Sequence, residues 1–367
     1  MACGRQGSNT GTGWRLTKEE SADRTGATDK YLVANAYYAY SADIVRRAAE
    51  ALGYEEDAKE YAALHHRITE MFNEEYITRT GRMVSETQTG CVLALHFNLA
   101  QEKHRKRIAK SLETNIANHK NHLSTGFVGT PYLCHVLSEN GMHELAGTIF
   151  LKEDYPSWLY AVKKGATTIW ERWNSIMPDG SFDESGMNSL NHYAYGSIGD
   201  WMYEKLAGIN PIKPGYKEMR IQPRFIKGIT SVDASFDSVY GTIRSAWSCR
   251  DGKITVDVSI PANTTAEVYL PEKEGALKLG SGSWHYEYDT ETRLEQDRFT
   301  MDTTLGALVQ EPAAVELFNQ YVPGMLDGPM IEFAYGMTIS ELTAVMPPEG
   351  IGVFQMVLET LNKQNKA

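Results

Sequence analysis

The chain has 367 residues, a length that accommodates two or three domains. Its net charge of -11 argues against nucleic acid as a partner, because binding to a phosphate backbone needs positive charge. No stretch approaches the ~18 consecutive apolar residues of a membrane-spanning helix, so we expect no membrane partner.

The four cysteines, Cys3, Cys91, Cys134 and Cys249, are far apart in the sequence. Their spacing fits neither a metal site nor a dense disulfide framework, which favours a reducing compartment. No other motif supports a metal or nucleotide role, so we expect no metal and no cofactor. Residues 1–13 are polar and glycine-rich and lack the apolar core of a signal peptide. We therefore expect a cytoplasmic protein, unless a signal peptide precedes this sequence.

Residues 30–207 have the apolar period of helices. The face of a first long helix is marked by Leu32, Val33, Ala36, Tyr37, Tyr40, Ile44 and Leu52, and Gly53 ends it. A second helix follows over 58–72, and the same period predicts further helices near 86–98, 103–119, 127–139, 142–151 and 190–207. Short connections predict antiparallel hairpins, which can close into an α/α toroid or remain an open solenoid. Periodicity alone does not separate these two arrangements.

A long aromatic segment over 153–189 interrupts the helices, and the apolar period changes to two after about residue 212. Asp251-Gly252 lies between two alternating runs and indicates a hairpin. We therefore predict an antiparallel β-sandwich over 213–292. Helical character returns over 300–367, where Thr338 and Glu341 fit a capping box. The expected fold class is α+β, with two domains and a small helical segment.

The sequence ATTIWERW at 166–173 is the densest group of residues that could carry chemistry. It places one carboxylate, Glu171, beside Trp170, Arg172 and Trp173. Indole rings stack on the apolar faces of sugars, and a carboxylate among them can take a proton from water. The alternative is a buried Glu–Arg pair that ties the end of a helix to the core.

A second group, MNSLNHYAYG at 187–196, contains His192 between Asn191 and Tyr193. This histidine could bind a sugar hydroxyl, or it could be a packing residue at a helix start. Asp183 and Glu184, in the loop GSFDESG, are typical of solvated loop acids.

Four blocks in this order resemble the bacterial α-L-rhamnosidases of glycoside hydrolase family 78: STGFVGTPY at 124–132, YPSWLY at 155–160, GATTIWERW at 165–173 and GMNSLNHYAYG at 186–196. Two later stretches, Gly-Ile-x-Pro at 208–211 and TSVDASFDSVYGTIRSAW at 230–247, also fit. The resemblance covers roughly residues 14–271, and several linked motifs are more specific than one.

The resemblance implies a partial (α/α)6 barrel over 14–212, followed by the sandwich over 213–292. It implies that Glu171 is the general base of an inverting hydrolysis of terminal α-L-rhamnosides, and that His192 lines the rhamnose pocket. The further sugar-binding candidates are Trp158, Trp170, Arg172, Trp173 and Asn191. The expected partners are rhamnosylated small molecules or oligosaccharides.

One expected motif is not found in these 367 residues. Family members carry an acidic block of the form D-x-x-x-x-x-E-R-x-G-W-x-G-D, which holds the general acid. Inverting hydrolysis needs two carboxyl groups, one for each face of the sugar. We therefore expect an N-terminally truncated or split product with impaired turnover. Two alternatives stay open, a non-catalytic carbohydrate-binding remnant and a different (α/α)6 hydrolase.

Overall fold

The computed structural model describes residues 27–183, 188–328, 331–344 and 348–364. The expected barrel start near Trp14 and the loop acid Glu184 lie outside the described residues. The chain divides into two compact units, residues 1–294 and 295–367, and each is described by itself.

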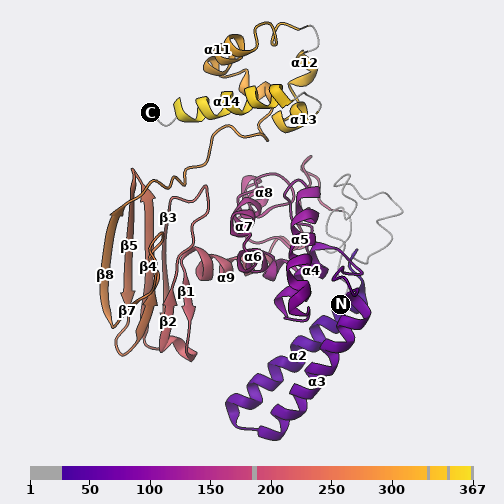
Figure 1. The fold of residues 1–367 in the computed structure, drawn as a ribbon, viewed down its shortest axis with the longest axis vertical. Coiled ribbons are helices and arrows are strands. Elements are labelled where there is room, and N and C mark those ends of the chain that lie inside the picture. Colours follow the sequence, from indigo (N-terminus) through magenta and orange to yellow (C-terminus); the bar gives the residue numbers. More distant parts are fainter. Residues whose placement is uncertain (1–26, 184–187, 329–330, 345–347, 365–367) are drawn as a thin grey trace. The chain divides into compact units, whose positions relative to one another are not determined.

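The first described elements of the first unit are two long helices that form a hairpin, α2 (Lys30–Leu52) and α3 (Glu55–Tyr76) (Figure 1). The Asp29 carboxylate caps α2 by accepting from the amides of Tyr31 and Leu32. Gly53 ends α2 in the left-handed conformation, as expected from the sequence. The face of α2 that is buried is mostly alanine, which allows α3 to pack closely against it.

Shorter helices follow and share one apolar core: α4 (Gln88–His96), α5 (Glu102–Asn118), α6 (Thr130–Glu139), α7 (His143–Phe150) and α8 (Trp158–Lys163). The prediction of one helix over 190–207 was wrong. This segment is a 3-10 turn (Ala194–Ser197), the short helix α9 (Ile198–Trp201) and a π-helical turn (Met202–Leu206). Gly196 and Gly199 lower the α-helical propensity there.

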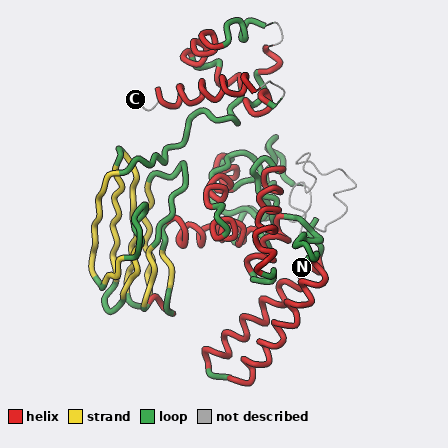
Figure 2. The backbone as a smooth tube through the Cα atoms, in the orientation of Figure 1, coloured by secondary structure: helices red, strands yellow, loops and turns green. Residues whose placement is uncertain are grey.

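Two four-stranded sheets follow the helices (Figure 2). Their strands are β1 (Ile209–Pro211), β2 (Glu218–Ile221), β3 (Ser231–Ser238), β4 (Gly241–Arg250), β5 (Lys253–Ile260), β6 (Thr265–Val268), β7 (Leu277–Leu279) and β8 (Gly282–Asp289). The orders are β1-β2-β6-β7 and β3-β4-β5-β8. Asp251 and Gly252, both with positive φ, form the predicted turn between β4 and β5.

The expectation of a purely antiparallel sandwich needs one correction. The second sheet is antiparallel throughout, but β2 and β6 pair in parallel, with Met219 opposite Ala266. A parallel pair requires a crossover connection, and here β3, β4 and β5 of the other sheet supply it. The first strand also begins at Ile209, before the expected boundary.

The helical part and the sheets are bonded together. The indole Nε1 of Trp247 donates to the carbonyl of Leu206 at 2.8 Å, and Ser245 Oγ donates to the carbonyl of Ala207 at 2.6 Å. Gly208 follows with φ +77, and an added Cβ would lie 2.1 Å from the backbone of Gln222. Only glycine fits this junction without strain.

The second unit has its own apolar core and no strand longer than an isolated bridge among its described residues. Its helices are α10 (Leu305–Leu308), α11 (Pro312–Tyr321), α12 (Ile331–Ala334), α13 (Ile339–Thr343) and α14 (Pro348–Gln364). The predicted capping box of Thr338 and Glu341 is present at the start of α13.

Candidate active site

Glu171 lies in the loop after α8, where two of the predicted motif blocks run alongside each other. The amide of Glu171 donates to the carbonyl of Ser189 at 2.8 Å, and that of His192 donates to the carbonyl of Ile169 at 2.8 Å. The Glu171 carboxylate is half-buried and accepts from the amide of Ser189 at 2.7 Å. Backbone pairing thus brings the blocks that contain Glu171 and His192 together.

The three tryptophans predicted to bind sugar are all buried. Trp170 and Trp173 are each 5% exposed, and Trp158 is 8% exposed. Trp158 Nε1 donates to the carbonyl of Tyr195 at 2.9 Å, and Trp173 Nε1 donates to the carbonyl of Thr125 at 3.0 Å. The three indoles belong to the apolar core of the helical part, and their direct role in sugar binding stays a prediction.

A series of aromatic contacts connects Trp173 to His192. Trp173 is stacked on Tyr195 with centroids 3.9 Å apart, and Phe127 contacts Tyr195 at 5.5 Å. His192 is stacked on Phe127 at 4.8 Å and on Tyr193 at 5.0 Å. Burial raises the pKa of the Tyr195 phenol well above its ordinary value, so this ring is neutral at any physiological pH.

Hydrogen bonding fixes the tautomer of His192. The amide of Ala194 donates to its Nδ1 at 3.2 Å, so in the neutral ring the hydrogen is on Nε2. The imidazole is half-buried and offers an N–H donor at Nε2. Asn191 is exposed, while Arg172 is half-buried beside Glu171. The roles of Asn191 and Arg172 in ligand binding stay predictions.

Sequence reasoning missed two residues here, Asp183 in the loop after α8 and Phe127 just before α6. Asp183, expected to be a solvated loop acid, is half-buried and accepts from Asn174 Nδ2 at 2.5 Å. Its negative charge adds to burial in raising the pKa of Tyr155. Phe127, which holds one face of His192, lies within the quoted block STGFVGTPY. The order of the motif blocks indicated the family, but the sequence does not show which aromatic rings stack on one another.

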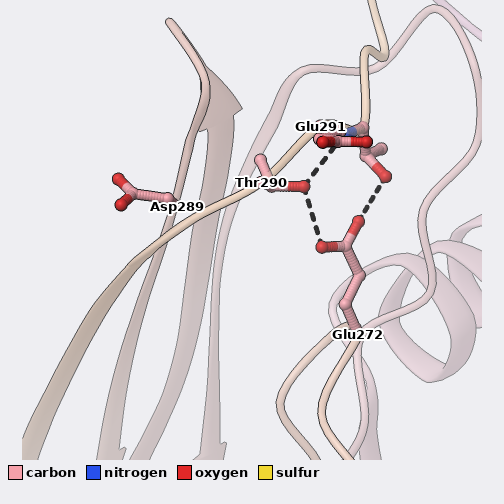
Figure 3. A pocket seen from close by; sticks show the side chains of 5 residues that line it. Glu272, Asp289, Thr290 and Glu291 are labelled. Carbon is pink, nitrogen blue, oxygen red and sulfur yellow. Dashed lines mark hydrogen bonds between the residues drawn. The ribbon is translucent and has the colours of Figure 1, made fainter.

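A separate cavity of about 430 Å³ lies in the sheet domain (Figure 3). It is lined by Glu272, Asp289, Thr290, Glu291 and Thr292. Both carboxylate oxygens of Glu272 accept hydroxyl hydrogen bonds, from Thr290 and from Thr292 (Figure 3). This cavity contains none of the residues predicted for the site and no aromatic ring on which a sugar could stack.

A buried histidine on α6 forms a second polar cluster. His135 is 5% exposed at its side chain; its Nδ1 lies 3.1 Å from Glu204 and its Nε2 lies 3.2 Å from Asp200. Burial alone would lower the pKa of His135, but the two carboxylates outweigh it and raise it to about 9. The two ring nitrogens face different carboxylates, as expected for an imidazolium rather than for a ligand to one metal ion.

The helical hairpins, the aromatic loop with its carboxylate and the two following sheets are the arrangement of a six-hairpin glycosidase domain followed by a C-terminal sheet domain. Residues 5–206 match the family model of the bacterial alpha-L-rhamnosidase 6 hairpin glycosidase domain, and residues 208–284 match that of the bacterial alpha-L-rhamnosidase C-terminal domain. The chain belongs to the bacterial α-L-rhamnosidase family, and the expected fold class is confirmed.

Two curated relatives are α-L-rhamnosidases. The protein from Streptomyces avermitilis is 44% identical over 244 residues, which are 66% of this chain and 24% of the relative. The protein from Formosa agariphila is 39% identical over 274 residues, which are 74% of this chain and 30% of the relative. The chain therefore spans about a quarter to a third of these relatives.

Solved structures agree with the curated relatives. The S. avermitilis α-L-rhamnosidase complexed with L-rhamnose matches with a TM-score of 0.68 at 40% identity, covering 71% of this chain and 27% of that one. The Aspergillus terreus α-L-rhamnosidase matches with a TM-score of 0.69 at 35% identity, covering 71% of this chain and 31% of that one.

Proposed function

We propose that this chain takes part in the hydrolysis of terminal α-L-rhamnosides, with Glu171 as the general base of an inverting reaction. The observation that carries the proposal is the pairing of the loop segments around residues 169–171 and 189–192, which holds Glu171 and His192 on adjacent backbone. The related S. avermitilis enzyme was crystallised with L-rhamnose, which supports the choice of sugar.

The chemistry assigned to these residues follows from their hydrogen bonds. One oxygen of Glu171 is held by the Ser189 amide, so the carboxylate is oriented. A carboxylate held in this way can accept a proton from a water that attacks the anomeric carbon. His192 can donate its Nε2 hydrogen to a sugar hydroxyl, because its Nδ1 is already an acceptor.

The general acid is the part of the reaction that these residues do not supply. The acidic block of the family is not found in the 367 residues, and the departing glycosidic oxygen needs a proton from the opposite face of the sugar. We propose that the chain alone hydrolyses natural rhamnosides very slowly. An aryl rhamnoside needs less help, because a nitrophenolate is a stable leaving group without protonation.

A carbohydrate-binding role without turnover is the second candidate, and the absence of the acidic block in this sequence favours it. The two functions differ in what Glu171→Gln changes. A binding module keeps most of its affinity for L-rhamnose when the carboxylate becomes a carboxamide of the same shape.

The test uses this chain and a longer version that restores the acidic block at its N-terminus. In the longer version, Glu171→Gln should lower kcat on nitrophenyl rhamnoside by about 10²–10⁴-fold, the usual loss for general base catalysis. The matched control is Glu113→Gln, which changes an exposed acid that pairs with Lys110 on α5. Calorimetry with L-rhamnose measures binding separately in both versions.

Two results would count against the proposal. Near-wild-type kcat of the Glu171→Gln variant would remove the general-base assignment. Equal activity of the short chain and the longer version on a natural rhamnoside would show that the acid lies within these 367 residues.

A further inference from the structure

The described residues of the second unit contain one local motif twice. In each copy a threonine in extended conformation caps a short helix with its hydroxyl group. Thr304 accepts from the amide of Ala307 in α10, and Thr338 accepts from the amide of Glu341 in α13. The backbone angles of the two threonines agree closely, with φ -75 and ψ 150 at Thr304 and φ -70 and ψ 156 at Thr338.

The apolar positions after the two threonines correspond as well. Four buried side chains follow at the same spacing, Leu305 and Leu308 in the first copy and Ile339 and Leu342 in the second. All four belong to the apolar core of the second unit. The two copies therefore share their capping residue, their backbone turn and their buried positions.

Each copy continues into a longer helix that begins at a proline, α11 in the first and α14 in the second. Residues 301–321 are named repeat 1 here, and residues 335–344 together with 348–364 are named repeat 2. The long helices meet through Phe318 and Phe354, whose rings are edge to face with centroids 5.3 Å apart. Phe318 is 0% exposed and Phe354 2%, so the repeats meet in the centre of this core.

The backbone hydrogen bonds between the repeats occur in reciprocal pairs. The amide of Leu305 donates to the carbonyl of Met337 at 3.0 Å. In return, the amide of Ile339 donates to the carbonyl of Thr303 at 2.9 Å. Ile339 is the counterpart of Leu305, and Met337 is the counterpart of Thr303, so exchanging the repeats turns each bond into the other.

A second reciprocal pair lies one position further along. The amide of Gly306 donates to the carbonyl of Tyr335 at 2.9 Å, and that of Ser340 donates to the carbonyl of Met301 at 2.7 Å. This is the pattern of the interface in a two-fold dimer, where each contact occurs twice with the roles of the partners exchanged.

We propose that repeats 1 and 2 are two copies of one unit that bind each other about a local two-fold axis. Each repeat is then an interaction surface whose partner is the other repeat. Size selects this partner at one point, because a Cβ on Gly306 would lie only 2.8 Å from the carbonyl oxygen of Tyr335. Two copies of repeat 2 would bring Ser340 against Tyr335, so the interface favours one repeat of each kind.

The same contacts can form between two chains. The connection between the repeats holds them at an effective concentration of about 1 mM, so an intact chain pairs within itself. When a different repeat is disabled in each of two chains, the two intact repeats have only each other as partners.

The first experiment disables one repeat at a time in the full chain. Leu305→Pro removes the amide that donates to Met337, and Ile339→Pro removes the amide that donates to Thr303. Each proline stands at the first position of a helix, after an extended residue, where the backbone tolerates it. Light scattering after size exclusion measures each variant alone and the mixture, at up to about 0.1 mM because the association replaces an effective concentration of about 1 mM.

The mixture should contain a species with twice the mass of either variant measured alone. The matched control mixes Leu305→Pro with Gly306→Val, whose side chain overlaps Tyr335 and disables the same repeat. That mixture has no intact repeat 1, so it should show only the masses of its separate components. Circular dichroism checks that the helices of the first unit remain folded in every variant.

A second experiment keeps the wild-type interface. A protease site is inserted after Gly324, which lies between α11 and α12 and has no atom within 4 Å of an added Cβ. After cleavage, the piece with repeat 2 should elute together with the rest of the chain. Phe354→Ala should weaken this association by about 100-fold or more, the usual effect of removing a buried phenylalanine. The control is Phe333→Ala, since Phe333 is 77% exposed on α12 of the same piece.

Three outcomes would overturn the proposal. The first is a mixture of Leu305→Pro and Ile339→Pro with no species beyond those of the single variants. The second is the same doubled mass in the control mixture, and the third is a wild-type cleaved piece that separates from the rest of the chain. The cleavage experiment decides the question if the proline variants aggregate, because its interface carries no substitution.

Discussion

At the scale of single residues, His135 connects α6 to the helical turns that lead into the sheets. Its ring faces Asp200 and Glu204, and Glu204 also bonds Lys205. In the unfolded chain a histidine loses its proton near its ordinary pKa of 6.5, whereas the folded protein holds this proton to about pH 9. The imidazolium therefore stabilises the fold fully below pH 6.5, and that contribution is lost as the pH rises through 9.

We expect His135→Gln to reduce the free energy of unfolding by up to about 3 kcal/mol near pH 6. The difference from wild type should shrink steadily between pH 6.5 and pH 9.5, because the wild-type ring becomes neutral there. Urea unfolding at a series of pH values measures this. His66→Gln is the control, since His66 is exposed and pairs with Glu70 on α3. A difference that stays constant with pH would show that the ring acts through packing alone.

The sequence predicted the candidate site only through its motif blocks. Glu171 and His192 lie in blocks whose order indicated the family, and backbone hydrogen bonds hold these blocks together in the structure. The contacts of Phe127 with His192 and Tyr195 could not be predicted, because they join residues more than 60 positions apart through ring stacking. The burial of the tryptophans was also not evident, since an indole suits a core as well as a sugar-binding surface.

At the scale of elements, two glycines have similar backbone conformations but differ in the room for a side chain. Comparing their alanine variants separates the cost of left-handed backbone from the cost of steric overlap. Gly208 has φ +77 and no room for a Cβ, whereas Gly53 has φ +78 and nothing within 4 Å of that position. Gly53→Ala should cost about 1 kcal/mol, the penalty of left-handed backbone. Gly208→Ala should cost about 3 kcal/mol or more, because the added carbon overlaps the backbone of Gln222 and Pro223.

Thermal unfolding of the two alanine variants under identical conditions tests this comparison. Equal losses for Gly53→Ala and Gly208→Ala would show that the junction between α9 and the sheets relaxes around the new side chain.

Element boundaries were predicted well where a local signal marks them and poorly where tertiary contacts decide. Gly53, Asp251-Gly252 and the Thr338 capping box all had local chemistry that fixed their structure. The segment 194–206 has a helical apolar pattern but forms three kinds of helical turn. The parallel pairing of β2 with β6 was missed because the period of a strand contains no information about its neighbour.

At the scale of the whole molecule, the helices and sheets of residues 27–294 should unfold together. Ile229 and Val232 pack against both the helical core and the sheet core, so loss of one core exposes the other. The core of residues 299–361 shares no residue with either among the described residues. We expect limited proteolysis to cut first within residues 295–298 and to release two protease-resistant pieces. Cuts spread evenly along the chain would contradict this division.

The parallel pair of β2 and β6 also limits the order in which the sheets are completed during synthesis. Strand β2 leaves the ribosome before its partner, and the intervening β3, β4 and β5 belong to the other sheet. In that other sheet β3, β4 and β5 pair as successive hairpins, whose partners are neighbours in sequence, and β8 joins β5 from farther along the chain. Until β6 emerges, β2 can pair only with the three residues of β1. Closing a loop of this length is slower than forming a hairpin, so β2 and β6 pair only after the hairpins of β3, β4 and β5 have formed.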